Sequence, residues 1–364
     1  MDRWLHLSVV VALLTLGGAV AGSTSATAEQ SPATVGVVVN EDGNTLALID
    51  PAAGRAINSN DLGGALDAPH LAAFDPAGRR LYVGTKSGSL VVVDVADPAA
   101  PKLVERVMPG EPTEIHWLAL ADGLVWLADE GESAVYAYDP ADLSEPEVVL
   151  GRDEGFDTPH GLALRPGTRE LWITNRPKEA PGFVLRVDAR ERAVIGAPLE
   201  TTGAAGDRPN NVGFTPDGRW GYAVNTGGKA TQVTVIDAET FAVETQVEQH
   251  PTQGLAPHAI TFHPGTGRMF VANKDGGTVS AIDVATNAVV GYVAVDEEPH
   301  GVGVGPDGRV FATAKGSNRV AVIDPERLEV VTEIEDPALA DPHQIVFLDD
   351  AAAMATPTIS TPST

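Results

Sequence analysis

The chain has 364 residues, a net charge of −26, an apolar content of 43% and no cysteine. The acidic charge argues against nucleic acid as a partner, because a phosphate backbone is bound through basic patches. The lack of cysteine excludes disulfides, a lipidated cysteine and a Cys-x-x-Cys-His haem motif, so an exported form must rely on packing for its stability.

The N-terminus is typical of a secretory signal peptide. Arg3 precedes an apolar stretch from Trp4 to about Val20, and small residues that suit cleavage stand at 19–21 and 26–28. We therefore expect residues 1–28 to be a signal peptide, with a retained N-terminal anchor as the alternative. The signal predicts a secreted, periplasmic or cell-surface protein that keeps no transmembrane segment after cleavage.

A phrase of the type Pro-His-Gly-Val-x-Val recurs along residues 33–349 at intervals of roughly 40–50 residues, the length of a propeller blade. Six of the nine histidines of the chain occupy the same place in this phrase. The seven copies are centred on His70, His116, His160, Asn210, His258, His300 and His343.

Each repeat reads as four short β segments. In the first complete repeat these are 69–74, 80–84, 90–94 and 102–107, and Asp75-Pro-Ala-Gly78 forms a turn between the first two. Short runs rich in Val and Ile with turn signals between them favour strands over helices. An aspartate ends the third segment of every repeat, where we expect it to cap a turn. These residues are Asp50, Asp94, Asp139, Asp188, Asp237, Asp283 and Asp324.

The two ends of the repeat region complement each other. Residues 35–39 and 45–50 match a second and a third segment, while 342–347 is a lone first segment. The C-terminal segment is therefore expected to pair beside residues 35–62 and close a ring of seven blades, which protects edge strands. Residues 350–364 read as a disordered Ser/Thr/Pro tail.

The Pro-His-Gly-Val-x-Val and Pro-Asp-Gly phrases, the endings at Asn175, Asn225 and Asn273, and the Val-Ile-Asp runs resemble the YVTN-repeat family, including its YncE-like members. The resemblance covers roughly residues 33–349. It implies an all-β, seven-bladed β-propeller with four-stranded antiparallel blades. It says little about activity, because propellers host unrelated functions.

The ring of histidines is the strongest functional signal. If the blades close, His70, His116, His160, His258, His300 and His343 line one mouth of the channel, and Asn210 fills the seventh place. Imidazole is the commonest ligand for copper and zinc, so three or four of these side chains could hold one ion on the arc away from Asn210. The alternative is a structural lining in which each His hydrogen-bonds a neighbouring backbone.

Positive charge is concentrated in the connections between second and third segments. Together with Asn210, Lys86, Arg176, Lys274 and Lys315 are predicted to bind an anionic ligand above the ring, and Lys178 and Lys229 share this face. The alternative is mutual salt bridges between loops. Acidic residues before the Pro-His phrase (Asp67, Asp157, Asp207, Glu298 and Asp341) are expected to orient imidazoles. His250 is expected at the mouth, and His263 on the surface of the opposite face.

These observations predict an exported, monomeric envelope propeller that binds a metal ion (copper or zinc), a small ligand or a protein partner at its His-lined mouth. A non-catalytic role is favoured over an enzyme, without excluding one. The alternatives are a copper-type redox protein, a lactonase-like hydrolase and a purely structural cell-surface protein.

Overall fold

The computed structural model describes residues 34–108, 114–205, 208–227, 232–249 and 255–348. The predicted signal peptide and C-terminal tail lie outside the described residues, as do Asp207, Lys229 and His250.

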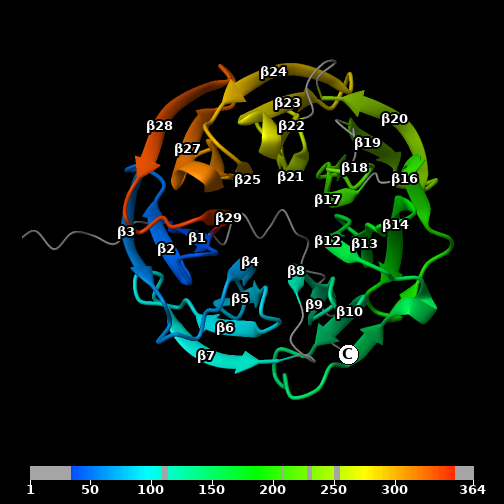
Figure 1. Cartoon of the computed structure of the whole chain (residues 1–364), viewed down its shortest axis with the longest axis horizontal. Helices are drawn as coiled ribbons and strands as arrows, with labels where there is room; N and C mark the ends of the chain where they lie inside the picture. The colour runs from blue at the N-terminus through cyan, green and yellow to red at the C-terminus, as the bar shows by residue number, and fades with distance from the viewer. Residues whose placement is uncertain (1–33, 109–113, 206–207, 228–231, 250–254, 349–364) are drawn as a thin grey trace, which may run out of the picture. The chain divides into compact units, whose positions relative to one another are not determined.

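The described chain forms seven antiparallel sheets arranged as blades around a common centre (Figure 1). Both ends of the propeller meet in one blade, made of β29 (Pro342–Phe347), β1 (Gly36–Asn40), β2 (Thr45–Asp50) and β3 (Arg55–Asn60). In this blade Val38 pairs with Ile345 and Gly36 with Phe347. The predicted closure of the ring by the C-terminal strand is confirmed.

The remaining blades follow in chain order, each with its innermost strand first (Figure 1). The first of these blades contains β4 (Pro69–Asp75), β5 (Arg80–Thr85), β6 (Leu90–Asp94) and β7 (Lys102–Val107), and the second contains β8 (Ile115–Ala121), β9 (Leu124–Asp129), β10 (Ala134–Tyr138) and β11 (Val148–Leu150). The third contains β12 (Pro159–Leu164), β13 (Glu170–Asn175), β14 (Pro181–Asp188) and β15 (Ala193–Val194), and β16 (Leu199–Ala205) also pairs with β14. The last three are β17 (Pro209–Phe214), β18 (Trp220–Asn225), β19 (Gln232–Asp237) and β20 (Ala242–Glu248); β21 (Pro257–His263), β22 (Arg268–Asn273), β23 (Thr278–Asp283) and β24 (Ala288–Ala294); and β25 (Pro299–Val304), β26 (Val310–Ala314), β27 (Arg319–Asp324) and β28 (Glu329–Glu335).

Apolar packing between neighbouring blades holds the ring together. The middle strands are buried on both faces, so they read as near-continuous Val, Ile and Leu runs, whereas the outermost strands β24 and β28 alternate between exposed and less exposed residues. At the closure, Val38 and Ile49 of the terminal blade pack with Phe311 and Val322 of the blade before it. Each blade therefore depends on its neighbours for its core, as in other repeat proteins.

The predicted aspartate caps are present in all seven blades. Asp50, for example, accepts a hydrogen bond from the backbone N–H of Ala53, and Asp94 accepts one from Ala96. The other five make the same contact with the turn that follows them. These carboxylates stabilise turns at the ends of the third strands.

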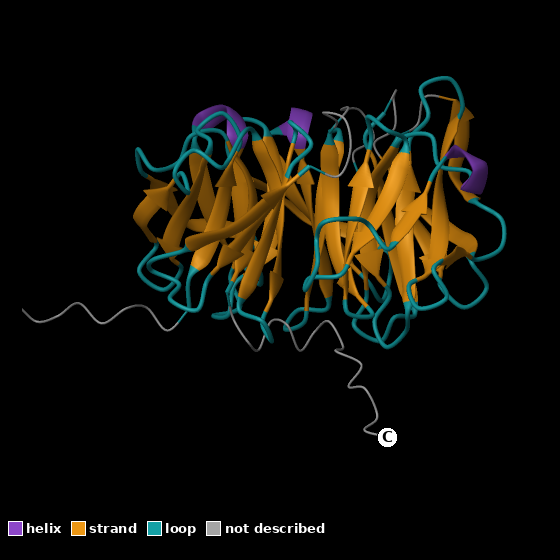
Figure 2. Ribbon diagram, turned by 90° about the horizontal axis from the view of Figure 1, so that it is seen from below, coloured by secondary structure: helices purple, strands orange, loops and turns teal. Residues whose placement is uncertain are grey.

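Helical structure in the described residues is limited to short 3-10 turns, η1 (Arg152–Glu154), η2 (Lys274–Gly276) and η3 (Lys315–Ser317). Viewed from the side, the blades carry loops at both ends of their strands (Figure 2). Within the described residues, no helix has the length and apolar character needed to cross a membrane.

Candidate metal centre

A β-bulge positions the ring residue at the start of every innermost strand. In β4, for example, Pro69 pairs with Thr85 and Leu71 with Gly84, so His70 is left without a partner in the ladder. The same shift of register occurs at the equivalent place of the other six blades. Bulges of this kind re-aim side chains, and here they turn the ring residues toward one another.

The six imidazoles lie in adjoining pairs around the channel. The ring centroids are 3.7 Å apart for His70 and His343, 4.9 Å for His70 and His116, and 4.6 Å for His116 and His160. On the other side, His258 lies 4.5 Å from His300, which lies 4.7 Å from His343. Asn210 occupies the seventh place, between His160 and His258.

Three ring residues hydrogen-bond the backbone of the next blade. His160 Nδ1 lies 2.6 Å from the carbonyl of Asn210, Asn210 Nδ2 donates to the carbonyl of His258 at 3.1 Å, and His258 Nδ1 lies 3.2 Å from the carbonyl of His300. A carbonyl only accepts, so Nδ1 of His160 and of His258 carries the proton, and Nε2 keeps its lone pair. Histidines that bind metals are usually held in this way. Asn210 keeps the structural hydrogen bond but lacks the ligand nitrogen.

Burial keeps most of the ring neutral. It lowers the pKa of His300 to about 4, and that of His70 to about 3 even though a hydrogen bond from His70 to Glu41 acts in the opposite direction. Burial, together with neighbouring positive charge, holds the pKa of His160, His258 and His343 well below the usual range. These imidazoles are therefore unprotonated at pH 7, the form that binds metals.

One arc of the ring consists of imidazoles alone. His258, His300 and His343 each offer a ligand atom, and these atoms lie within 4.8 Å of one another. The three side chains line a cavity of about 170 Å³ together with Trp117 and Gln344. His300 Nδ1 lies 3.2 Å from the carbonyl of Glu298, which leaves its Nε2 with a lone pair. His343 Nδ1 is buried and has no hydrogen-bond partner among the described residues.

A buried carboxylate that the sequence reasoning missed lies beside this arc. Glu41 Oε2 is 3.0 Å from His70 Nδ1 and 3.9 Å from His343 Nε2. Lys86 and Lys315 donate to the same carboxylate at 2.7 and 3.3 Å. Burial alone would raise the pKa of Glu41, but the hydrogen bonds from His70 and Lys86 outweigh it and hold the pKa below the usual range. Glu41 is therefore ionised and already neutralised by two ammonium groups.

A second carboxylate that the sequence reasoning missed, Glu130, lies beside the opposite arc of the ring. Glu130 Oε2 lies 3.3 Å from His116 Nε2 and forms an ion pair with Arg176. Glu114 approaches the same His116 nitrogen at 3.2 Å. His116, Glu130 and His160 together offer three ligand atoms within 4.8 Å of one another.

The repeat contains a signal that could have identified both residues. Glu41 and Glu130 each donate a backbone N–H to the carbonyl two residues before the adjacent ring histidine. Lys86, Arg176 and Lys274 make the same backbone hydrogen bond in their own blades. The position that carries a cation in several blades therefore carries a glutamate in two of them, and aligning the repeats on this position shows it.

The cationic residues predicted to bind an anion are engaged with carboxylates. Lys86 and Lys315 contact Glu41, and Lys315 also lies 3.2 Å from Asp341. Arg176 pairs with Glu130 and donates to Asn210 Oδ1 at 2.8 Å. The carboxylates that contact imidazoles are thus Glu41, Glu114 and Glu130. Asp341, one of the acidic residues expected to orient an imidazole, pairs with Lys315 instead.

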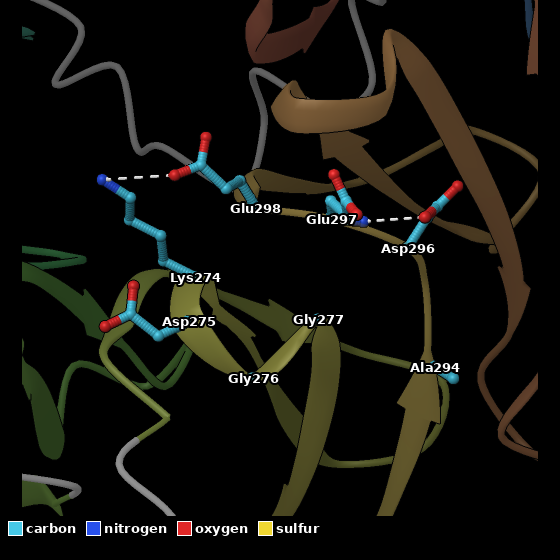
Figure 3. A pocket seen from close by; sticks show the side chains of 8 residues that line it. All are labelled: Lys274, Asp275, Gly276, Gly277, Ala294, Asp296, Glu297 and Glu298. Atoms are coloured by element: carbon cyan, nitrogen blue, oxygen red, sulfur yellow. Dashed lines mark hydrogen bonds and ion pairs between the residues drawn. The ribbon is translucent and has the colours of Figure 1, made fainter.

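Lys274 lies in a separate pocket formed by the β22–β23 connection, the end of β24 and the loop that leads from β24 to β25 (Figure 3). This pocket has a volume of about 700 Å³ and is lined by Lys274, Asp275, Asp296, Glu297 and Glu298 among others. Lys274 Nζ lies 4.0 Å from a carboxylate oxygen of Glu298. The charged side chains that line this pocket are four carboxylates and one ammonium group, and this negative balance does not favour an anionic ligand.

The family described as "Lactonase, 7-bladed beta-propeller" matches residues 170–351, and an LVIVD repeat matches residues 78–109. The uncharacterized protein YncE of Salmonella typhi is 23% identical over 69% of this chain and 72% of its own length. A 6-phosphogluconolactonase of Klebsiella pneumoniae is also 23% identical, over 67% of this chain and 77% of its own length.

Solved structures share the fold at low sequence identity. A putative 6-phosphogluconolactonase from Bacteroides uniformis aligns with a TM-score of 0.71 and 15% identity, over 86% of this chain and 99% of its own. Apo AztD from Citrobacter koseri aligns with a TM-score of 0.58 and 14% identity, over 86% of this chain and 97% of its own.

Proposed function

The chain belongs to the seven-bladed β-propeller lactonase family, and we propose that it is an exported binding protein for copper or zinc. The ion is held by His258, His300 and His343 at the mouth of the channel. The signal-like sequence of residues 1–28 supports export.

The observation that carries this proposal is the convergence of three neutral imidazoles on one cavity. The Nδ1 atoms of His258 and His300 are committed to backbone carbonyls, so their Nε2 atoms are free to act as ligands. Three protein nitrogens with an open fourth position suit zinc, and imidazole also suits copper. The ammonium groups of Lys86 and Lys315 donate to Glu41. Among the described residues, no lysine or arginine donates a hydrogen bond to the three imidazoles.

Two alternatives use the same fold. Lactone hydrolysis is the second candidate, because the family description and the printed names of the Klebsiella relatives point to it. It is tested by measuring hydrolysis of a lactone and of 6-phosphogluconolactone by the zinc-loaded protein. A structural lining is the remaining alternative, since the ring residues do support one another through the backbone.

Asn210 suggests a substitution that separates the structural and ligand roles. The fold accepts Asn at a ring position, where it keeps the hydrogen bond to the next blade. His258→Asn should therefore preserve the ring and remove one ligand. His70→Asn is the matched control, since His70 is a ring histidine outside the proposed arc.

The test is titration of the purified, metal-free chain with zinc and with copper, followed by calorimetry. We expect tight binding in the wild type and in His70→Asn. His258→Asn should lose roughly 100-fold or more in affinity, because losing a ligand costs more than losing a hydrogen-bond partner of a ligand, and its melting temperature should be unchanged. If His258→Asn binds as tightly as the wild type, the arc is not the site. If the wild type binds neither metal, the structural lining is the correct interpretation.

A further inference from the structure

We propose a second metal site in the same ring, formed by His116, Glu130 and His160. It shares no residue with the three-histidine arc and goes beyond the function proposed above. Asn210 separates the two sets on one side of the ring, and His70 on the other.

The two carboxylates already lie at metal-ligand spacing from His116, and the ligand atom of His160 lies within 4.8 Å of those of His116 and Glu130. Ligands bonded at 2.0–2.1 Å in tetrahedral geometry lie about 3.3 Å from one another. His116 Nε2 lies 3.3 Å from Glu130 Oε2 and 3.2 Å from Glu114 Oε2. The imidazoles of His116 and His160 are 4.6 Å apart between centroids, with an interplanar angle of 34°. An ion between these groups would need the His160 nitrogen, now within 4.8 Å of the other ligand atoms, to close to about 3.3 Å from them, a change that side-chain rotation can supply.

The hydrogen bonding of the metal-free pair is incomplete. His116 is only 7% exposed, and its Nδ1 has no hydrogen-bond partner among the described residues. Its Nε2 faces two carboxylates, Glu114 and Glu130. His160 is 2% exposed and commits its Nδ1 to the Asn210 carbonyl, so its Nε2 remains available. Carboxylates only accept, so His116 Nε2 carries the proton in the metal-free chain, and a cation bound at this nitrogen would displace that proton.

The donor set indicates the class of ion and its relative affinity. Two imidazoles with one carboxylate, and Glu114 near enough to become a fourth ligand, suit a divalent ion of the zinc type. However, Glu130 also pairs with Arg176, and Arg208 lies 3.7 Å from its other oxygen. These guanidinium groups orient the carboxylate but repel a cation. We therefore expect this site to bind zinc more weakly than the three-histidine arc, and to fill second.

The test counts zinc per chain by titration and by elemental analysis after desalting, with Zn²⁺ alone as the probe. The wild type should bind two zinc ions in two resolved steps. His160→Asn and Glu130→Gln should each lose the weaker step and keep the tighter one. His160→Asn copies the residue found at Asn210, so the hydrogen bond to the next blade is retained. If His160→Asn fails to fold, Glu130→Gln decides the matter.

The outcomes also separate this site from the arc. His258→Asn should lose the tighter step and keep the weaker one. A single zinc in the wild type, lost in His258→Asn and retained in Glu130→Gln, would overturn the second site and leave the proposed function intact. Two zinc ions that persist in both Glu130→Gln and His160→Asn would also overturn it. No zinc at all would overturn both proposals.

Discussion

Acidification should destabilise the metal-free propeller through its buried histidines, and His300 allows the effect to be worked out. His300 is 5% exposed, and burial lowers its pKa from 6.5 to about 4. Between these two values the unfolded chain binds a proton that the folded chain does not. Stability is therefore lost as the pH falls from about 6.5 to about 4, and this contribution changes no further below that.

The pKa difference of roughly 2.5 units corresponds to roughly 3 kcal/mol for this one side chain. His300→Asn removes the titrating group, so the free energy of unfolding of the wild type should fall by roughly 3 kcal/mol more than that of the variant between pH 7 and pH 4. Comparing the two proteins cancels the titration of the carboxylates that they share.

The assay is urea denaturation of both proteins at several pH values in the presence of EDTA. The difference between the two unfolding free energies should change mainly between pH 6.5 and 4. If the two profiles stay parallel within about 0.5 kcal/mol over this range, His300 is not held neutral by burial and the reasoning about the ring is wrong.

Three further predictions follow from the same contacts. Because the pKa of His300 lies near 4, zinc should be retained during dialysis at pH 5 and released as the pH approaches 4. Elemental analysis of the dialysed protein measures this, and release of zinc already at pH 6 would contradict it. Glu41→Gln leaves Lys86 and Lys315 without their shared carboxylate, so the free energy of unfolding from urea denaturation should fall by roughly 2 kcal/mol. The loss is smaller than for a fully buried ion pair because Lys86 is partly exposed. An unchanged denaturation midpoint would show that these ion pairs do not stabilise the fold. Ending the chain at Glu335 removes β29 and should abolish cooperative thermal unfolding. Ending it at residue 351 should leave the melting curve unchanged, and equal melting curves for the two truncations would contradict closure by β29.

The sequence was sufficient to predict the architecture because blades are built from local signals. Repeated Pro-His phrases and aspartate-capped turns follow from short-range spacing, and the unmatched segments at the two ends required the pairing seen between Val38 and Ile345. Each of these features depends on only one strand and its neighbour. The seven-bladed fold and the place of the C-terminal strand were therefore predicted correctly.

The details of the site depend on contacts between blades, which spacing does not reveal. The sequence pattern pointed to the acidic residues before the Pro-His phrase and so missed Glu41 and Glu130. The carboxylates that reach imidazoles mostly follow the second strands. His263 was wrongly expected on the surface. It is 5% exposed, since a turn of the next blade covers it and the Gly308 carbonyl lies 2.7 Å from its Nε2.

X-ray absorption at the zinc edge, on protein loaded with one equivalent of zinc, tests directly whether His258, His300 and His343 hold the ion. We expect three imidazole nitrogens at about 2.0–2.1 Å, with a further light ligand in the open position. In His258→Asn the imidazole scattering should fall under the same loading. A shell of oxygen ligands without imidazole scattering in the wild type would contradict the three-histidine site.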